Sequence, residues 1–120
     1  MAASDESELV KMINTSVQIN DRPSAFRYPR GNGIGIELPN EEENLIIGKG
    51  KFVKEGKQVA LVNFGARLQE CLIAEKNLSK KGIFPTIFDA RFAKPLDENS
   101  LWQIATNHEI IITIEEGSIG

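Results

Sequence analysis

The 120-residue chain carries 17 acidic and 14 basic side chains, for a formal net charge of −3, and 41% of its residues are hydrophobic. This balance excludes a basic nucleic-acid-binding arm, an acidic tail and wholesale disorder, and the length suits about one domain of the usual ~100–150 residues. One cysteine, Cys71, cannot close an internal disulfide, and one histidine, His108, leaves no readable metal cage. The chain has neither a signal peptide nor an apolar run of the ~20 residues that span a membrane, so we expect a soluble intracellular protein.

The first twenty residues predict an amphipathic helix. Apolar side chains recur there at spacings of three and four, which places them on one helix face. They are Leu9, Met12, Ile13 and Val17. Asp5 with Glu8 three positions later is typical of a capping box, so the helix should begin near Asp5 and end before the break at residues 20–23.

Residues 24–28 are a candidate for a short strand that Pro29 ends. Beyond Pro29 the chain is rich in glycine, proline and like charge and has little apolar material to bury, which predicts an extended linker. We therefore divide the chain into residues 1–36, a linker at residues 37–44, and a second domain at residues 45–120.

From residue 45 onward, strand and helix patterns alternate. The predicted elements are an extended segment at 45–53, a turn at Glu55-Gly56, a strand at 58–63, a helix at 67–81, a strand at 83–89, a helix from 95 to 107 and a strand at 109–114. The apolar runs at 59–62 and 110–112 suit strands that are covered on both faces. This order predicts an α/β fold with right-handed crossovers and a mostly parallel sheet between helices.

The last six residues, 115–120, follow a buried-type strand where a parallel α/β unit normally continues with a covering helix. We therefore expect a truncated piece of a larger protein. Without that helix the sheet should expose apolar surface, which favours dimerisation, exchange of the N-terminal helix or marginal folding.

Two arginines, Arg27 and Arg30, are the most informative candidates for a binding site. A guanidinium binds phosphate in bidentate fashion, but residues three apart on a strand face opposite sides, so one of the two is the better candidate. The plain structural alternative is an arginine that pairs with a carboxylate across an interface.

For the other candidate residues, a structural role is the simpler interpretation. The loop Gly31-Asn32-Gly33-Ile34-Gly35 is not a phosphate-binding fingerprint, and the turn at residues 63–67 is more simply a tight strand-to-helix connection than an anion site. His108 follows a helix end and suits its dipole, and Cys71 suits a core position. Glu115 and Glu116 are adjacent, so they should face opposite ways and cannot form an acid/base pair.

Five blocks of the sequence, in order and at the expected spacing, resemble 1-deoxy-D-xylulose-5-phosphate synthases. The blocks are Ala25-Phe26-Arg27-Tyr28-Pro29-Arg30-Gly31-Asn32-Gly33, Ile47-Gly48-Lys49-Gly50, Asn63-Phe64-Gly65, Asp89-Ala90-Arg91-Phe92-Ala93-Lys94-Pro95-Leu96-Asp97 and Ile114-Glu115-Glu116-Gly117-Ser118-Ile119-Gly120. The similarity spans nearly the whole chain, and the arginine block separates this family from ordinary transketolases.

The resemblance implies an enzyme that uses thiamine diphosphate and Mg²⁺ to condense pyruvate with glyceraldehyde 3-phosphate, with loss of CO₂, for isoprenoid precursors. It implies that residues 1–36 end a pyrimidine-binding domain and that residues 45–120 are most of a transketolase C-terminal domain. Arg30 matches the arginine that holds the substrate phosphate, and Arg27 is the second candidate. A homodimer in the bacterial cytoplasm or in plastids is implied as well.

The family's cofactor motif and catalytic residues have no counterpart in this sequence, so the resemblance implies no catalytic, cofactor-binding or metal-binding residue here. An isolated chain of this kind should be inactive. Two alternatives remain: a non-catalytic α/β module that binds a partner or an anion near Gly65, and a fragment of another enzyme such as a transketolase or the β subunit of a 2-oxo-acid dehydrogenase.

Overall fold

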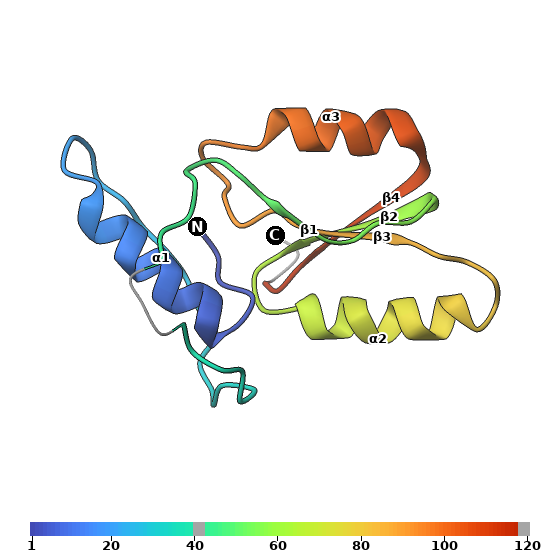
Figure 1. The fold of residues 1–120 in the computed structure, drawn as a ribbon, viewed down its shortest axis with the longest axis horizontal. Helices are drawn as coiled ribbons and strands as arrows, with labels where there is room; N and C mark the ends of the chain where they lie inside the picture. The colour runs from blue at the N-terminus through green and yellow to red at the C-terminus, as the bar shows by residue number, and fades with distance from the viewer. Residues whose placement is uncertain (40–42, 118–120) are drawn as a thin grey trace.

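The computed structural model describes residues 1–39 and 43–117. Two helices cover opposite faces of a four-stranded sheet, and a third helix lies to one side, next to the carboxyl ends of the parallel strands (Figure 1). The elements are α1 Glu6–Gln18, β1 Lys51–Lys54, β2 Gln58–Phe64, α2 Leu68–Ser79, β3 Thr86–Asp89, α3 Glu98–Asn107 and β4 His108–Glu115. None of the helices in the described ranges is long and apolar enough to cross a bilayer.

The sheet has the order β1-β3-β2-β4, and β2 runs parallel to both β3 and β4. The predicted α/β class with a mostly parallel sheet is thus confirmed. β1 is the exception, because it pairs antiparallel with β3 and has an irregularity between Phe52 and Lys54. The turn after β1 is present, but it does not make a hairpin with β2. Instead Gly56 N–H donates to the hydroxyl of Thr86, 2.9 Å away, at the start of β3.

The core lies on both faces of the sheet. Between the sheet and α3 are Ala60, Val62, Phe88, Ala90 and Ile104. Between the sheet and α2 are Leu61, Leu68, Cys71 and Ile87. Successive residues of β2 therefore enter opposite clusters, as the period of a strand requires. The prediction that β2 is covered on both faces is confirmed.

The prediction that the last strand is likewise covered is wrong. β4 lies at the edge of the sheet, and Ile110, Ile111 and Ile112 are 53%, 43% and 46% exposed. The apolar run was a correct signal for a strand, but apolar composition does not distinguish an edge position from a central one.

The N-terminal segment packs across the carboxyl ends of the parallel strands. Asp5 accepts a hydrogen bond from Glu8 N–H at 2.8 Å, so the predicted helix start is confirmed. Met12 is fully buried in a third cluster with Ala3, Leu45 and Phe92. Ile13 and Val17 from the same predicted face are 40% and 74% exposed, because the domain covers only part of that face.

Residues 24–28 do not form the predicted strand. Arg27 alone makes a single parallel bridge, with Ala2, and the flanking Pro23 and Pro29 lack the N–H groups that would extend the pairing. The predicted linker falls partly on residues 40–42, which lie outside the described residues, and its remaining positions form neither helix nor strand.

Candidate functional site

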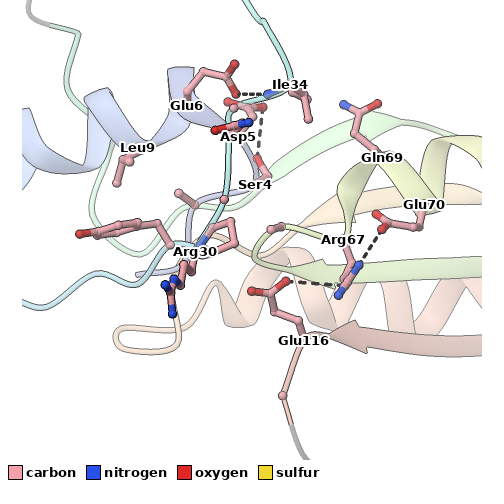
Figure 2. Close-up of a pocket in the computed structure, with 18 residues that line it drawn as sticks. Ser4, Asp5, Glu6, Leu9, Arg30, Ile34, Arg67, Gln69, Glu70 and Glu116 are labelled. Carbon is pink, nitrogen blue, oxygen red and sulfur yellow. Dashed lines mark hydrogen bonds and ion pairs between the residues drawn. The ribbon is translucent and has the colours of Figure 1, made fainter.

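A cleft of about 1010 Å³ lies between the N-terminal segment and the domain (Figure 2). Its lining comes from residues 3–6, Leu9 and residues 28–34 on one side, and from Ala66, Arg67, Gln69, Glu70, Glu116 and Gly117 on the other. The second group follows β2 and β4 and begins α2, so the cleft lies at the carboxyl ends of parallel strands. Open α/β sheets generally bind their ligands there.

The two candidate arginines have different surroundings. Arg30 is exposed on the N-terminal side of the cleft, and no hydrogen bond or ion pair joins it to another described residue (Figure 2). Arg27 is engaged, because its Nη2 donates to Glu115 Oε1 at 2.6 Å and its guanidinium lies 4.9 Å from the centre of the Phe64 ring. The structural alternative considered for these arginines therefore describes Arg27.

A third arginine, Arg67, crosses the domain side of the cleft. Its guanidinium bonds Glu70 at 2.8 Å and lies 3.6 Å from Glu116 (Figure 2). The hydrogen bond from Arg67 lowers the pKa of Glu70 below its ordinary value. Glu115, the last residue of β4, and Glu116, which follows the strand, thus bind different arginines.

The glycine-rich loop forms an anion cradle that is filled by the protein itself. The carboxylate of Glu6 accepts backbone hydrogen bonds from Ile34 at 3.2 Å, Gly35 at 2.6 Å and Ile36 at 3.0 Å. A hydrogen bond from its own backbone N–H, followed by those from these three amides, lowers the pKa of Glu6, although desolvation opposes them. A Cβ at Gly33 would lie 2.6 Å from Glu6 Oε1, so a larger residue there would displace this carboxylate. No local pattern predicts this pairing, since the partners lie 28–30 positions apart.

A buried polar cluster lies next to the cleft, where β2 and β3 end. Asn63 Nδ2 donates to the Gly65 carbonyl at 2.8 Å and to Asp89 at 3.3 Å, and Arg91 bonds Glu8 of α1 at 2.6 Å. Burial raises the pKa of Asp89 to about 6, despite a favourable hydrogen bond from Asn63. Sequence reasoning missed this cluster. Its only local signal was polar residues directly after apolar strands.

His108 and Cys71 have structural surroundings. Nδ1 of His108 is 2.9 Å from the Ile104 carbonyl, which can only accept, so Nδ1 carries a proton, and Nε2 lies 2.7 Å from the Thr86 hydroxyl. Both ring nitrogens are therefore engaged, and no free base is presented. Cys71 is 2% exposed, and burial raises the pKa of its thiol, which makes it a poor nucleophile.

The described residues do not fit a site for thiamine diphosphate and its metal ion. They contain no group of three or more His, Cys, Asp or Glu side chains that could hold a metal. Each carboxylate that lines the cleft already has a partner: Glu70 and Glu116 pair with Arg67, Asp5 caps α1 through Glu8 N–H, and Glu6 accepts from the amides of residues 34–36. No step of a reaction is therefore assigned to a cofactor on this chain.

Comparison with known proteins matches residues 48–120 to the family model "Transketolase, C-terminal domain". A solved structure described as a split gene transketolase, inactive β4 tetramer, superposes with a TM-score of 0.80 at 25% sequence identity. That match covers 96% of this chain, which spans 37% of the other chain. Because the family model covers more than half of the sequence and the fold agrees, the chain belongs to the transketolase C-terminal domain family.

Proposed function

We propose that this chain is the C-terminal part of a 1-deoxy-D-xylulose-5-phosphate synthase and that Arg30 binds the phosphate of glyceraldehyde 3-phosphate. Family membership supports a thiamine-diphosphate enzyme of the transketolase type. The narrower assignment rests on the five sequence blocks, above all Arg27-Tyr28-Pro29-Arg30-Gly31. In this proposal residues 1–36 end the pyrimidine-binding domain, and the cofactor and Mg²⁺ are held by parts of the enzyme outside this chain.

The observation that carries the proposal is which of the arginines Arg27, Arg30 and Arg67 have a carboxylate partner. Arg27 and Arg67 have carboxylate partners, whereas Arg30 has none among the described residues. An exposed guanidinium without a carboxylate retains its full capacity for a bidentate bond to a phosphate dianion. Arg30 is therefore the better candidate of the two arginines singled out from the sequence.

The role of Arg30 would be positional. Pyruvate has no phosphate, so a phosphate-binding arginine acts on the acceptor aldehyde only. When bound, the cofactor supplies the carbanion chemistry that decarboxylates pyruvate. Arg30 would hold the far end of the acceptor and so orient its aldehyde, and binding energy spent at a remote group lowers the barrier at the reacting carbon.

Replacement of Arg30 by Ala in the intact enzyme tests the proposal. Charge-assisted hydrogen bonds contribute about 1.5–3 kcal/mol, so we expect the KM for glyceraldehyde 3-phosphate to rise about 10- to 100-fold while the KM for pyruvate changes little. Arg67→Ala is the matched control, because it removes an arginine of the same cleft that already has carboxylate partners. Equal effects of Arg30→Ala on both substrates would remove Arg30 from this role.

Two further measurements separate the alternatives. A phosphate titration of this chain by NMR that moves the resonances of Gly65 but not those of Arg30 would favour an anion-binding module. Assays of the intact enzyme with the acceptors of transketolase and of 2-oxo-acid dehydrogenases would reveal a different member of the superfamily. We also propose a homodimer; the description of the split gene transketolase as a tetramer supports oligomerisation.

A further inference from the structure

The lining of the cleft includes the dipeptide Asn32-Gly33, the one place in the chain where a glycine follows an asparagine. The eight other asparagines are followed by larger residues. Asparagine is a thermolabile residue type, because the backbone nitrogen of the next residue can attack its side-chain carbonyl carbon. A glycine at that next position has no Cβ to hinder the approach and leaves the backbone free to turn. Asn32 is therefore the asparagine whose neighbour hinders this reaction least.

The surroundings of this dipeptide leave both reacting groups accessible. Asn32 and Gly33 are exposed and lie in a stretch that is neither helix nor strand. Within the described part of the chain, no hydrogen bond or ion pair reaches residues 28–33. The contact of the loop with Glu6 begins at Ile34, one residue after Gly33. The amide nitrogen of Gly33 can therefore approach the carboxamide of Asn32 without the loss of a hydrogen bond.

Other asparagines of the chain are protected from this reaction by their structure. Asn63 is fully buried, and its carboxamide donates hydrogen bonds to two neighbours. Asn77 lies inside α2, where the helical backbone engages the next amide. Asn99 lies in α3, and the N–H of the next residue, Ser100, donates to Asp97 at 3.3 Å. These three asparagines are therefore internal references for the reactivity of Asn32.

We propose that Asn32 is a site of spontaneous deamidation and that the carboxylate formed there weakens phosphate binding by Arg30. In the first step the Gly33 nitrogen forms a bond to the side-chain carbonyl carbon of Asn32 and loses its proton. The bond from that carbon to Nδ2 breaks, and ammonia leaves with the proton. Water then opens the cyclic imide: cleavage at the side-chain carbon gives aspartate, and cleavage at the backbone carbon gives isoaspartate. Solvent water is the co-reactant, and the step needs neither an oxidant nor a cofactor.

The modification changes the cleft in two ways. The new carboxylate lies two positions from Arg30, on the same side of the cleft, and opposes the binding of an anion there. Isoaspartate also adds a methylene group to the main chain between two fixed points, the hydrogen-bonded backbone of Arg27 and the amides bound by Glu6. The residues between these points must shift to accommodate it. The effect on phosphate rests on the proposed function, whereas the deamidation itself does not.

Incubation of the 120-residue chain at pH 5 and at pH 8, followed by peptide mass spectrometry, tests the modification. We expect the mass change from amide to acid to occur at Asn32 before it occurs at Asn63, Asn77 or Asn99. It should be faster at pH 8, because the attacking amide nitrogen must lose its proton. Asn32→Gln is the control and should abolish the change in this peptide, because glutamine must close a larger ring. Equal rates at Asn32 and Asn77, or an unchanged rate in Asn32→Gln, would overturn the inference.

Asn32→Asp carries the new carboxylate from the start and tests its effect on the site. The measurement is a titration of the ¹⁵N-labelled chain with inorganic phosphate, followed at the Arg30 Nε–Hε resonance. We expect Asn32→Asp to weaken phosphate affinity about two- to fivefold, the factor that an exposed ion pair can supply, and Asn32→Gln to leave it unchanged. Equal affinities of Asn32→Asp and the wild type would overturn the effect on phosphate. Deamidation at Asn32 without any response of Arg30 to phosphate would support the modification site and contradict the proposed phosphate site.

Discussion

Replacement of Asp89 by Asn should stabilise the protein at neutral pH. Asp89 is 1% exposed at the end of β3, and burial raises the pKa of its carboxyl from the ordinary 3.8 to about 6. The neighbouring side chain, Asn63, has a buried Oδ1 with no donor among the described residues. A protonated carboxyl or a carboxamide at position 89 brings a donor into this cluster, which a carboxylate cannot do.

The direction of the pH effect follows from the two pKa values. Between pH 3.8 and about 6 the folded protein holds a proton on Asp89 that the unfolded chain has released, so this group's contribution to stability is lost as the pH rises through about 6. The difference between the two values corresponds to about 3 kcal/mol, at about 1.4 kcal/mol for each pH unit. Because neighbouring polar groups can relax, we expect Asp89→Asn to gain about 1–3 kcal/mol at pH 7.5.

Urea denaturation of both proteins at pH 5, 6, 7 and 8 measures this effect. The free energy of unfolding of the wild type should fall from pH 5 to pH 7 relative to that of Asp89→Asn. Asp97→Asn is the control of opposite sign: although burial opposes it, hydrogen bonds from Ser100, Gly50 and Lys49 keep the pKa of Asp97 below its ordinary value. That variant should be less stable at neutral pH. Parallel pH curves for wild type and Asp89→Asn would refute the reasoning.

Three further predictions follow from the packing and the loops. Gly56→Ala should lower the free energy of unfolding by about 2–3 kcal/mol in urea denaturation, since the added Cβ would lie 2.0 Å from the backbone oxygen of Phe84. In the control Gly82→Ala the added Cβ meets no neighbour, so the decrease should be smaller. Ile111→Lys on the exposed edge strand β4 should raise the protein concentration at which copies of the chain associate in analytical ultracentrifugation. Unchanged association would show that the copies do not meet through β4. Glu6→Gln should accelerate amide hydrogen exchange at Gly35 and Ile36, and equal exchange rates would show that the carboxylate does not hold this loop.

Local patterns in the sequence predicted most of the elements of the fold. The apolar run of β2 and the capping residue Asp5 located a strand and a helix start, because each is a relation between residues a few positions apart. The helix predicted at residues 67–81 is α2, and Gly82, with φ of 80°, lies just beyond it. The failures were long-range: which strand lies at the edge, and that β1 pairs with β3 and not with β2, depend on contacts that no local pattern encodes.

The candidate site was predicted in part. Arg27 and Arg30 stood out because of residue type and the proline between them; Arg30 lines the cleft, whereas Arg27 lines a separate small pocket. Their contacts with carboxylates could not be predicted: Glu115, which binds Arg27, lies 88 positions from it, and Glu6, which binds the glycine-rich loop, lies 29 positions from Gly35. Contacts between residues so far apart in the sequence can be identified only from the folded structure.

Arg91 joins the N-terminal segment to the domain in two ways at once. Its φ of 56° turns the chain after β3, so that its carbonyl accepts from Ala2 N–H at 2.9 Å while its guanidinium binds Glu8. Neither contact can be broken by sliding the segment along the domain, because one is made by the backbone and the other by the side chain of the same residue. The two portions separated at the predicted linker should therefore melt together, in one calorimetric transition, as a single cooperative unit.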